Sequence, residues 1–399
     1  MPTWKTGRLN AHYALLQAAY WAGYATVWGY LSVLLLSKGF SNAQTGLISA
    51  IALLSTVVVQ PWLSGLADRH KAVTSRLLAL GLTGLLLVFI VVVWVSPAQW
   101  LTAAALVGVG LTLTAIAPYF NAMAMELTHS GAELNYGLGR GVGSVCFAVA
   151  TWLLGMVLEK SSPSILFPIG MAIFAVMLLA VFFFRYTHTE AQEASPQETG
   201  TALSTPQLLK KYPAFLLLMV GCALLMAGHS STNTYMNHIV SKAGAGESAM
   251  GTVLAISAMV ELPSMSLFPK LQRKLSLPVL FRICAVSYCV RNLLFLVGHS
   301  MPVFYIAAVL QCTEYAFFIP ATVYYVSERI DLANQVKGQA LIYTASSGIG
   351  SAVGAITCGM ALDRGGPNAM LWLTQIFITL GMLVVFLATA RRTKREERK

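Results

Sequence analysis

The chain has 399 residues, of which 57% are hydrophobic and only 10% are charged, and its mean hydropathy is +0.69. A soluble domain of this size carries far more charge, so the composition excludes an ordinary globular protein and predicts a membrane protein. The formal net charge of +11 does not indicate nucleic-acid binding, because most Lys and Arg residues gather on one side of the apolar runs.

Apolar runs of about 20 residues or more recur along the chain, and each is long enough to cross ~30 Å of hydrocarbon as a helix. Backbone groups in lipid must satisfy one another, so helices are expected rather than open sheet. We predict an all-α membrane protein with twelve transmembrane helices in two six-helix bundles. The predicted spans are 9–36, 44–66, 76–97, 100–125, 135–158, 163–185, 213–240, 248–269, 277–297, 302–326, 335–361 and 368–390.

A polar segment separates the first six spans from the last six. It runs from His188 to Tyr212, contains Pro and Gly, and has no apolar period, which is typical of a flexible linker. The predicted domains are therefore an N-terminal bundle (1–187), a cytoplasmic linker (188–212) and a C-terminal bundle with a basic cytoplasmic tail (213–399). Transporters with two such halves bind their solutes near the membrane midplane, between the halves.

The distribution of basic residues predicts the orientation of the chain. An even number of spans puts both termini on one side, and most Lys and Arg residues lie on that side. The positive-inside rule then places both termini in the cytoplasm. We expect a multi-pass protein of a bacterial cytoplasmic (inner) membrane, whose basic tail, 391–399, meets anionic lipid headgroups.

The first span carries a polar face. Tyr20 and Tyr24 lie one helical turn apart, in line with Tyr13 and Gln17. Such a stripe on an apolar helix fits the lining of a solute pathway, although single members of a stripe also serve simply to bridge helices. Tyr20 and Tyr24 are candidate substrate-binding residues.

The loop between the second and third spans contains Ser64, Gly65, Asp68, Arg69 and Arg76. Glycine permits a tight turn, and an aspartate can cap a helix start or pair with a basic neighbour. An ordinary polar turn has the same composition, so the residues alone assign no role to this loop.

Polar residues in the fourth and fifth spans are further candidates. A charge at membrane depth costs at least ~2.5–3.5 kcal/mol, which marks Arg140 as a functional candidate. Its guanidinium group can donate a fork of hydrogen bonds to paired hydroxyls or to a carboxylate. Phe147 lies two turns further on the same face and offers a ring to a sugar or nucleoside, although such a ring more often only packs. Asn121 is a second polar candidate.

Glycines spaced four residues apart occur in the fifth and eleventh spans. The pairs are Gly137/Gly141, Gly139/Gly143 and Gly350/Gly354. This spacing predicts helices that approach closely, and smooth contacts of this kind also allow helices to slide or rock.

The C-terminal half carries a polar stripe and three buried charges. His229, Asn233 and Asn237 share one face of the seventh span. Glu261 lies in the eighth span, two residues before a proline, where an acid can accept hydrogen bonds from a hydroxyl-rich solute. For His229 a purely structural role is an equal alternative.

The tenth span contains the acid that best fits a proton site. Apolar surroundings raise the pKa of a carboxyl group and a nearby guanidinium lowers it, so a carboxyl between both influences can bind and release a proton near neutral pH. Glu314 has apolar neighbours, and Arg291 of the ninth span is its natural counterion. A static salt bridge between the two helices is the alternative.

The loop 64–76 resembles the signature of the major facilitator superfamily, G-x-x-x-D-R followed by basic residues. The signature lies between the same two spans, with Asp68 and Arg69 in place, while the family's first glycine falls on Ser64 with Gly65 beside it. Together with twelve spans and a central loop, this resemblance covers essentially the whole chain.

A closer resemblance is to the lactose-permease-like oligosaccharide:proton symporters. Tyr136-Gly-Leu-Gly-Arg140-Gly-Val-Gly143 is similar to their fifth-span signature, in which the arginine binds sugar, and Phe147 falls on their ring-stacking tryptophan. Glu261 matches their sugar-binding glutamate, Arg291 their ninth-span arginine, and Glu314 their proton-carrying glutamate.

The chain departs from that family at four positions. Gln311 replaces the histidine that joins the family's proton and sugar sites, and Asn121 replaces the acidic partner of the arginine. His229 stands in place of an aspartate and Ser347 in place of a lysine. The resemblance therefore implies proton coupling at Glu314 without implying galactoside specificity, and nucleoside:proton symporters share the same broad pattern.

These patterns predict a proton-coupled symporter that imports a polar small solute, first a saccharide, by alternating access. The alternatives are a nucleoside:proton symporter, a drug or metabolite:proton antiporter of the same fold, and a membrane receptor. No nucleophile–base pair or metal cluster indicates an enzyme. We expect no cofactor or metal, the proton as coupling ion, and membrane lipid and solute as the partners of a monomer. Glu314 and Arg291 are the predicted proton-coupling residues, and Arg140, Glu261, Phe147, Asn121, His229, Asn233, Gln311, Tyr20 and Tyr24 are the predicted substrate-binding residues.

Overall fold

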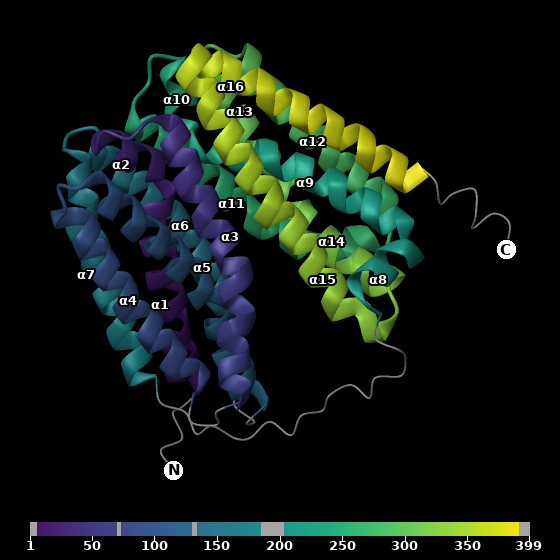
Figure 1. Ribbon diagram of the computed structural model, residues 1–399, viewed down its shortest axis with the longest axis horizontal. Coiled ribbons are helices and arrows are strands. Elements are labelled where there is room, and N and C mark those ends of the chain that lie inside the picture. Colours follow the sequence, from purple (N-terminus) through teal and green to yellow (C-terminus); the bar gives the residue numbers. More distant parts are fainter. Residues whose placement is uncertain (1–5, 70–72, 130–133, 185–202, 391–399) are drawn as a thin grey trace, which may run out of the picture. The chain divides into compact units, whose positions relative to one another are not determined.

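The computed structural model describes residues 6–69, 73–129, 134–184 and 203–390, and within these ranges it contains helices and no strands (Figure 1). The chain divides into two compact units. Unit 1 comprises Met1–Phe40 and Ile51–Ala194, and unit 2 comprises Ser41–Ala50 and Ser195–Lys399.

In unit 1, α1 packs against α6 and α7, and α4 packs against α5 and α7. Two of these helices begin at polar caps: the Thr74 hydroxyl accepts a hydrogen bond from the Leu77 amide, and the Asn135 side chain accepts one from the Leu138 amide. The helices are α1 (Thr6–Tyr24), a π-helical turn η1 (Ala25–Gly29), α2 (Leu31–Ser37), α3 (Asn42–Arg69), α4 (Ser75–Val95), α5 (Gln99–His129), α6 (Tyr136–Leu158), the short η2 (Pro163–Ile165) and α7 (Leu166–Phe183).

In unit 2, α9 packs along α16, and α12 packs against α14 and α16. The helices are α8 (Thr205–Lys211), α9 (Pro213–Thr234), α10 (Met236–Ser241), α11 (Glu247–Gln272), α12 (Leu277–Val297), α13 (Met301–Val309), η3 (Leu310–Cys312), α14 (Tyr315–Arg329), η4 (Leu332–Asn334), α15 (Gln335–Tyr343), the π-helical η5 (Thr344–Gly350) and α16 (Ser351–Ala390).

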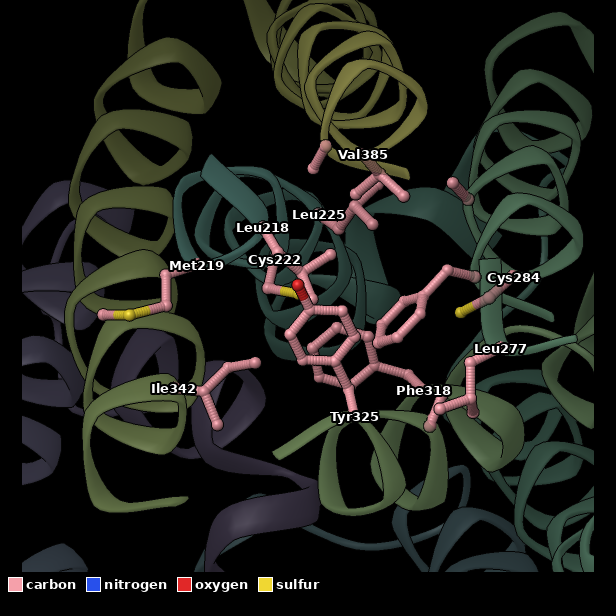
Figure 2. Close-up of a cluster of buried hydrophobic side chains, with 14 of the residues drawn as sticks. Leu218, Met219, Cys222, Leu225, Leu277, Cys284, Phe318, Tyr325, Ile342 and Val385 are labelled. Atoms are coloured by element: carbon pink, nitrogen blue, oxygen red, sulfur yellow. The ribbon is translucent and has the colours of Figure 1, made fainter. Parts of the chain in front are cut away.

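A cluster of buried apolar side chains holds the helices of unit 2 together. Figure 2 shows Leu225 of α9, Cys284 of α12, Phe318 and Tyr325 of α14, and Val385 of α16 meeting in this cluster. Lipid tails are as apolar as these side chains, so van der Waals fit between helices stabilises such a cluster more than removal from water does.

The helices reproduce the predicted spans with local breaks. Within the described residues, ten helical ranges are long and apolar enough to cross a membrane. The last of them, Leu332–Ala390, has 59 residues with non-helical φ/ψ angles at Gly366. Because this range holds two predicted spans, counting it twice and adding residues 6–37 gives the twelve predicted crossings. The breaks at η1, η3 and η5 were not predicted; π-helical turns within helices often mark functional sites.

Two local predictions require correction. Gly65 was predicted in a turn, but α3 continues through it to Arg69, since glycine is well tolerated inside transmembrane helices. The last part of the predicted linker contains α8, which begins at a capping box formed by Ser204 and Gln207. Residues 188–202 of the linker and the tail 391–399 lie outside the described residues.

Helix α8 is attached to unit 2 by two of its residues. Leu208 is fully buried in the unit 2 cluster, and Lys211 forms an exposed ion pair with Asp331. The hydrogen bond from Lys211 holds the pKa of the Asp331 carboxyl below its ordinary value. This part of the predicted linker is therefore packed structure.

The first turns of α3 group with unit 2 because of specific polar contacts. The Asp363 carboxylate accepts hydrogen bonds from the Asn42 and Ala43 amides at 3.1 and 2.8 Å, which caps the start of α3. The Tyr235 hydroxyl lies 3.0 Å from the Asn42 carbonyl oxygen and 2.9 Å from that of Ala355.

The predicted glycine spacing corresponds to close helix contacts at four positions. A Cβ atom on Gly139 or Gly143 would lie 2.5 Å from the ring of Tyr13 or Trp21 in α1. On Gly350 or Gly354 it would lie 2.3 or 2.1 Å from a backbone carbonyl oxygen of α9. Only glycine fits at these contacts. A Cβ atom on Gly137 would lie 3.6 Å from Asn135 Oδ1, an ordinary contact, so close packing does not require glycine at this position.

Gly354→Ala is expected to destabilise the protein by about 1–3 kcal/mol, because the added methyl group meets backbone rather than a movable side chain. The measurement is thermal unfolding of the purified protein in detergent. Gly81→Ala is the matched control, because a Cβ atom there meets no atom within 4 Å. Equal unfolding temperatures for the two variants would contradict the close approach of α9 and α16.

Candidate functional site

A break in the tenth span positions Glu314. Helix α13 ends at Val309, the short η3 follows, and α14 begins directly after Glu314. The amide of Glu314 donates to the Leu310 carbonyl oxygen at 3.1 Å, and the Cys284 thiol donates to the Glu314 carbonyl oxygen at 3.0 Å. The carboxyl group therefore lies at the positive end of the α14 dipole, which favours a negative charge.

Arg291 of α12 contacts this carboxyl group directly. Its Nη1 atom lies 2.9 Å from Oε2 and 3.1 Å from Oε1 of Glu314, and each residue is 2% exposed. Taking two charges out of water is costly, and their mutual attraction offsets that cost only when the geometry is close and further hydrogen bonds are made. The predicted counterion is thus in contact with the predicted proton-binding acid.

Two residues of α9 complete a closed ring of polar contacts. His229 Nδ1 lies 2.9 Å from Glu314 Oε1, and His229 Nε2 lies 3.0 Å from Asn233 Nδ2. Arg291 Nη2 donates to Asn233 Oδ1 at 3.5 Å and so closes the ring. His229 is 5% exposed whereas Asn233 is half-buried, so Asn233 is the most accessible member.

Aromatic rings fix the plane of the histidine. Tyr315 stacks on His229 with ring centroids 4.8 Å apart and an interplanar angle of 3°, and Tyr288 meets it edge-on at 5.5 Å. A ring held in this way cannot turn freely, so its two nitrogens stay directed at Glu314 and Asn233.

The turn before Glu314 carries a second acid contact. The buried Gln311 of η3 donates through Nε2 to Oε1 of the half-buried Glu261 of α11. Glu261 and Gln311, two of the predicted substrate-binding residues, therefore contact each other, and Gln311 lies three positions before Glu314 in the sequence. Gln311 occupies the position at which the lactose-permease-like symporters, which the sequence resembles, have a histidine.

Unit 1 holds Arg140 beside a cluster of aromatic side chains. Its guanidinium carbon lies 4.3 Å from the ring centroid of Trp21, and Nη1 donates to the Ser144 hydroxyl at 3.1 Å. Phe147 meets Trp21 edge-on at 6.2 Å and lies 6.4 Å from Tyr24. The name unit 1 aromatic cluster is used below for the group formed by Arg140, Trp21, Tyr24 and Phe147.

The charge of Arg140 is not paired within its own surroundings. Among the residues that the structure describes, none places a carboxylate within ion-pair distance of Arg140. Asn121, which takes the place of the family's acidic partner, instead accepts a hydrogen bond from Tyr136 at 3.2 Å. Guanidinium N–H groups are thus available for solute hydroxyls or a carboxylate.

The remaining predicted residues have other partners as well. Tyr20 meets Trp21 edge-on at 5.2 Å and lies 6.2 Å from Tyr24, so its ring borders the unit 1 aromatic cluster. It is 3% exposed and its hydroxyl donates to the Leu113 carbonyl oxygen at 2.9 Å, so within unit 1 it bridges α1 and α5. Arg76 donates to the carbonyl oxygens of Val181 and Phe182, which satisfies the end of α7. The side chains of Asp68 and Arg69 lie outside the described residues.

Sequence reasoning missed Trp21, Ser144 and Tyr315. The spacing of Trp21 offered a signal, because it lies four residues after Gln17 and their side chains hydrogen-bond at 3.2 Å. Ser144 likewise lies one turn after Arg140. Tyr315 gave no signal, because the break after η3 changes which residues of the tenth span share a face.

Comparison with known proteins shows the family. Residues 9–373 match the model of the MFS_1 like family, and the chain belongs to that family within the major facilitator superfamily. An uncharacterised transporter of Bacillus subtilis, YwbF, is 23% identical over 398 residues, which cover 97% of this chain and 96% of YwbF. The chain is thus a membrane transport protein rather than an enzyme.

Solved structures share the fold. A point mutant of the nucleoside transporter NupG matches with a TM-score of 0.82 at 15% identity, covering 96% of this chain and 99% of that one. A bacterial homologue of the human lysosomal transporter Spinster matches with a TM-score of 0.69 at 13% identity, covering 96% and 97%. These likenesses confirm the predicted fold class.

Arg291→Met is expected to destabilise the protein by about 3–5 kcal/mol, because it leaves the buried Glu314 carboxylate uncompensated. The double variant Arg291→Met/Glu314→Gln should recover most of that loss. Thermal unfolding in detergent measures both, with Arg282→Met as the control because that guanidinium bonds the neutral Thr389 hydroxyl. A double variant as unstable as the sum of the single ones would contradict a coupled pair.

Proposed function

We propose that this member of the MFS_1 like family is a proton-coupled symporter that imports a polar, ring-bearing solute by alternating access. The observation that supports this most is a buried carboxyl group, Glu314, held between Arg291 and His229 inside a broken transmembrane helix. Ionisable groups at membrane depth are costly, and proton relays in transporters are one of the few uses that favour them.

The proton step follows from the charges around Glu314. As a carboxylate, it neutralises Arg291 within hydrogen-bond distance. When Glu314 takes up a proton, the pair acquires a net positive charge and the contact between Arg291 and Glu314 weakens. The guanidinium group of Arg291 can then bond another acceptor. Protonation and solute binding therefore favour each other.

The solute is assigned by the chemistry of the candidate binding residues. The unit 1 aromatic cluster offers flat apolar rings beside the guanidinium group of Arg140. A saccharide presents an apolar C–H face to such rings and paired hydroxyls to the guanidinium fork. Glu261 and Gln311, which bond each other within unit 2, are the other predicted binding residues and carry an acceptor and a donor of the kind that hydroxyls use. A saccharide is the first candidate.

A nucleoside is the second candidate. A nucleobase stacks on aromatic rings more extensively than a sugar does, and the unit 1 aromatic cluster holds three rings, of which Trp21 lies against Arg140. NupG, the nucleoside transporter with a TM-score of 0.82, has the same fold. We place the protein in a bacterial cytoplasmic membrane with both termini in the cytoplasm, as a monomer without cofactor or metal.

Proton-driven accumulation is expected to vanish in Glu314→Gln, because an amide cannot take up the coupling proton. Equilibrium exchange, measured as counterflow in proteoliposomes without a pH gradient, should be retained because the amide keeps hydrogen bonds to Arg291 and His229. Glu328→Gln, an exposed acid bonded to Gln272, is the matched control. Undiminished uphill uptake by Glu314→Gln would remove Glu314 from the proton path.

Arg140→Gln is expected to weaken solute binding by about 10-fold to 100-fold, since each hydrogen bond from a charged donor contributes about 1.5–3 kcal/mol. Arg140→Lys keeps the charge but loses the fork and should also bind weakly. The measurement is the thermal shift caused by a panel of mono- and disaccharides, nucleosides and aromatic acids. Wild-type shifts that persist in Arg140→Gln would exclude Arg140 from the binding site.

A further inference from the structure

Four of the contacts among Glu314, His229, Asn233 and Arg291 form a ring in which each hydrogen bond has a direction. Arg291 only donates, and an ionised carboxylate only accepts. The two residues between them, His229 and Asn233, each donate at one atom and accept at another. The direction in which they do so depends on the charge of Glu314, and this dependence rests on the proposed proton-binding role of that residue.

With Glu314 ionised, every role in the ring is fixed. Arg291 Nη2 donates to Asn233 Oδ1, which orients the amide so that its Nδ2 atom faces His229 Nε2. Nδ2 donates, so Nε2 accepts and the ring proton of the histidine resides on Nδ1. Nδ1 then donates to Glu314 Oε1 at 2.9 Å. All four ring contacts are satisfied in this one arrangement. Arg291 Nη1 also lies 3.4 Å from His229 Nδ1, but it lies closer to the Glu314 oxygens, at 3.1 and 2.9 Å, so the carboxylate rather than the ring nitrogen accepts from it.

Neighbouring groups do not supply another acceptor for a protonated Glu314. The Tyr288 hydroxyl is directed at Met226, the Cys284 thiol bonds the backbone of Glu314, and Tyr315 presents its ring face to His229. Glu261 is bound to Gln311 in the turn before. Among the described residues, His229 and Arg291 are those within hydrogen-bond distance of the Glu314 carboxyl oxygens.

A proton that reaches Glu314 must therefore reverse the ring. A proton arrives at His229 Nε2, the nitrogen on the more accessible Asn233 side, and the Nδ1 proton passes to Glu314 Oε1. The histidine stays neutral, Glu314 gains one proton, and Nδ1 now accepts from the new O–H group. Nε2–H has become a donor facing the donor Nδ2, so the amide of Asn233 turns to present Oδ1 instead.

The turn of the amide releases two donors at once. Asn233 Nδ2 now faces Arg291 Nη2, and two donors cannot bond each other. Because Asn233 is half-buried while the other three residues are buried, its amide is the member open to the exterior of the ring. An oxygen atom of a bound solute satisfies both released donors, whether it belongs to a hydroxyl, a carbonyl or a carboxylate group.

We propose that His229 transfers the proton and that Asn233 is the positioning residue through which protonation of Glu314 raises affinity for the solute. Loaded with a proton, the ring offers the solute two donors that the unprotonated ring keeps for itself. Proton binding thus precedes tight solute binding, and release of the proton returns the donors to the ring and expels the solute.

The test is nitrogen NMR of the wild-type protein in lipid nanodiscs, with ¹⁵N-labelled histidine and asparagine and no added solute. His229 should carry its proton on Nδ1 at high pH and on Nε2 at low pH. The Asn233 side-chain amide should shift over the same pH range. The signals are assigned by their loss in His229→Gln and Asn233→Leu.

Variants separate the switch from a structural role. Glu314→Gln should hold His229 as Nε2–H at every pH, because its amide nitrogen donates to Nδ1 while its oxygen accepts from Arg291. Asn237→Ala removes an amide one turn further on α10 and should leave both signals as in the wild type. A variant that merely loosened the fold would not move the proton between two nitrogens.

Several outcomes would overturn the proposal or part of it. Nδ1–H at all pH values in the wild type would remove the ring reversal, and so would a pH-dependent tautomer in Glu314→Gln. A histidine switch without an accompanying Asn233 shift would remove Asn233. If Glu314→Gln loses proton-driven uptake but His229 of the wild type never changes its tautomer, the protein is a symporter without the ring reversal. If His229 changes its tautomer but the wild type shows no proton-driven uptake, the ring reversal stands and the proposed symport is wrong.

Discussion

The cost of a charge away from water is the constraint on which this structure depends. Glu314 and Arg291 are each 2% exposed, and neither is tolerable there without the other. Their contact at 2.9 Å requires a carboxyl group to face α12 from the tenth span, and the break at η3 presents it there. The dipole of α14 and the hydrogen bond from His229 complete the stabilisation of the carboxylate.

The same constraint separates the chemistry of the two units. Unit 2 holds a ring of donors and acceptors that bond one another, and in our proposal the direction of the ring depends on one proton. Unit 1 holds an arginine with aromatic neighbours and no carboxylate among its described contacts, so it keeps donors for a solute. A symporter needs both kinds of group, one that responds to the proton and one that recognises what is carried.

Much of the fold could be predicted from the sequence because lipid leaves few options. Apolar length alone located the spans, and glycine spacing located the contacts of Gly350 and Gly354 with α9. The breaks at η1, η3 and η5 could not be predicted, because hydropathy is the same for a straight and a broken helix. The continuation of α3 through Gly65 was missed because glycine is as compatible with a helix in lipid as with a turn.

The sequence predicted which residues belong to the candidate site better than it predicted which of them contact one another. Buried charge marked Glu314, Arg291, Arg140 and Glu261, but no pattern in one sequence shows that His229 bonds Glu314 while Asn233 bonds both His229 and Arg291. Trp21 was overlooked because a tryptophan in an apolar helix is ordinarily packing. Side-chain direction across helices is the information that spacing along one helix cannot supply.

The most direct measurement of the central claim is infrared difference spectroscopy between low and high pH in lipid. The account predicts a carbonyl band of a protonated carboxylic acid that is absent in Glu314→Gln and altered in frequency in His229→Gln. A band that persists unchanged in Glu314→Gln, or the absence of any band from a buried acid, would contradict a proton site at Glu314.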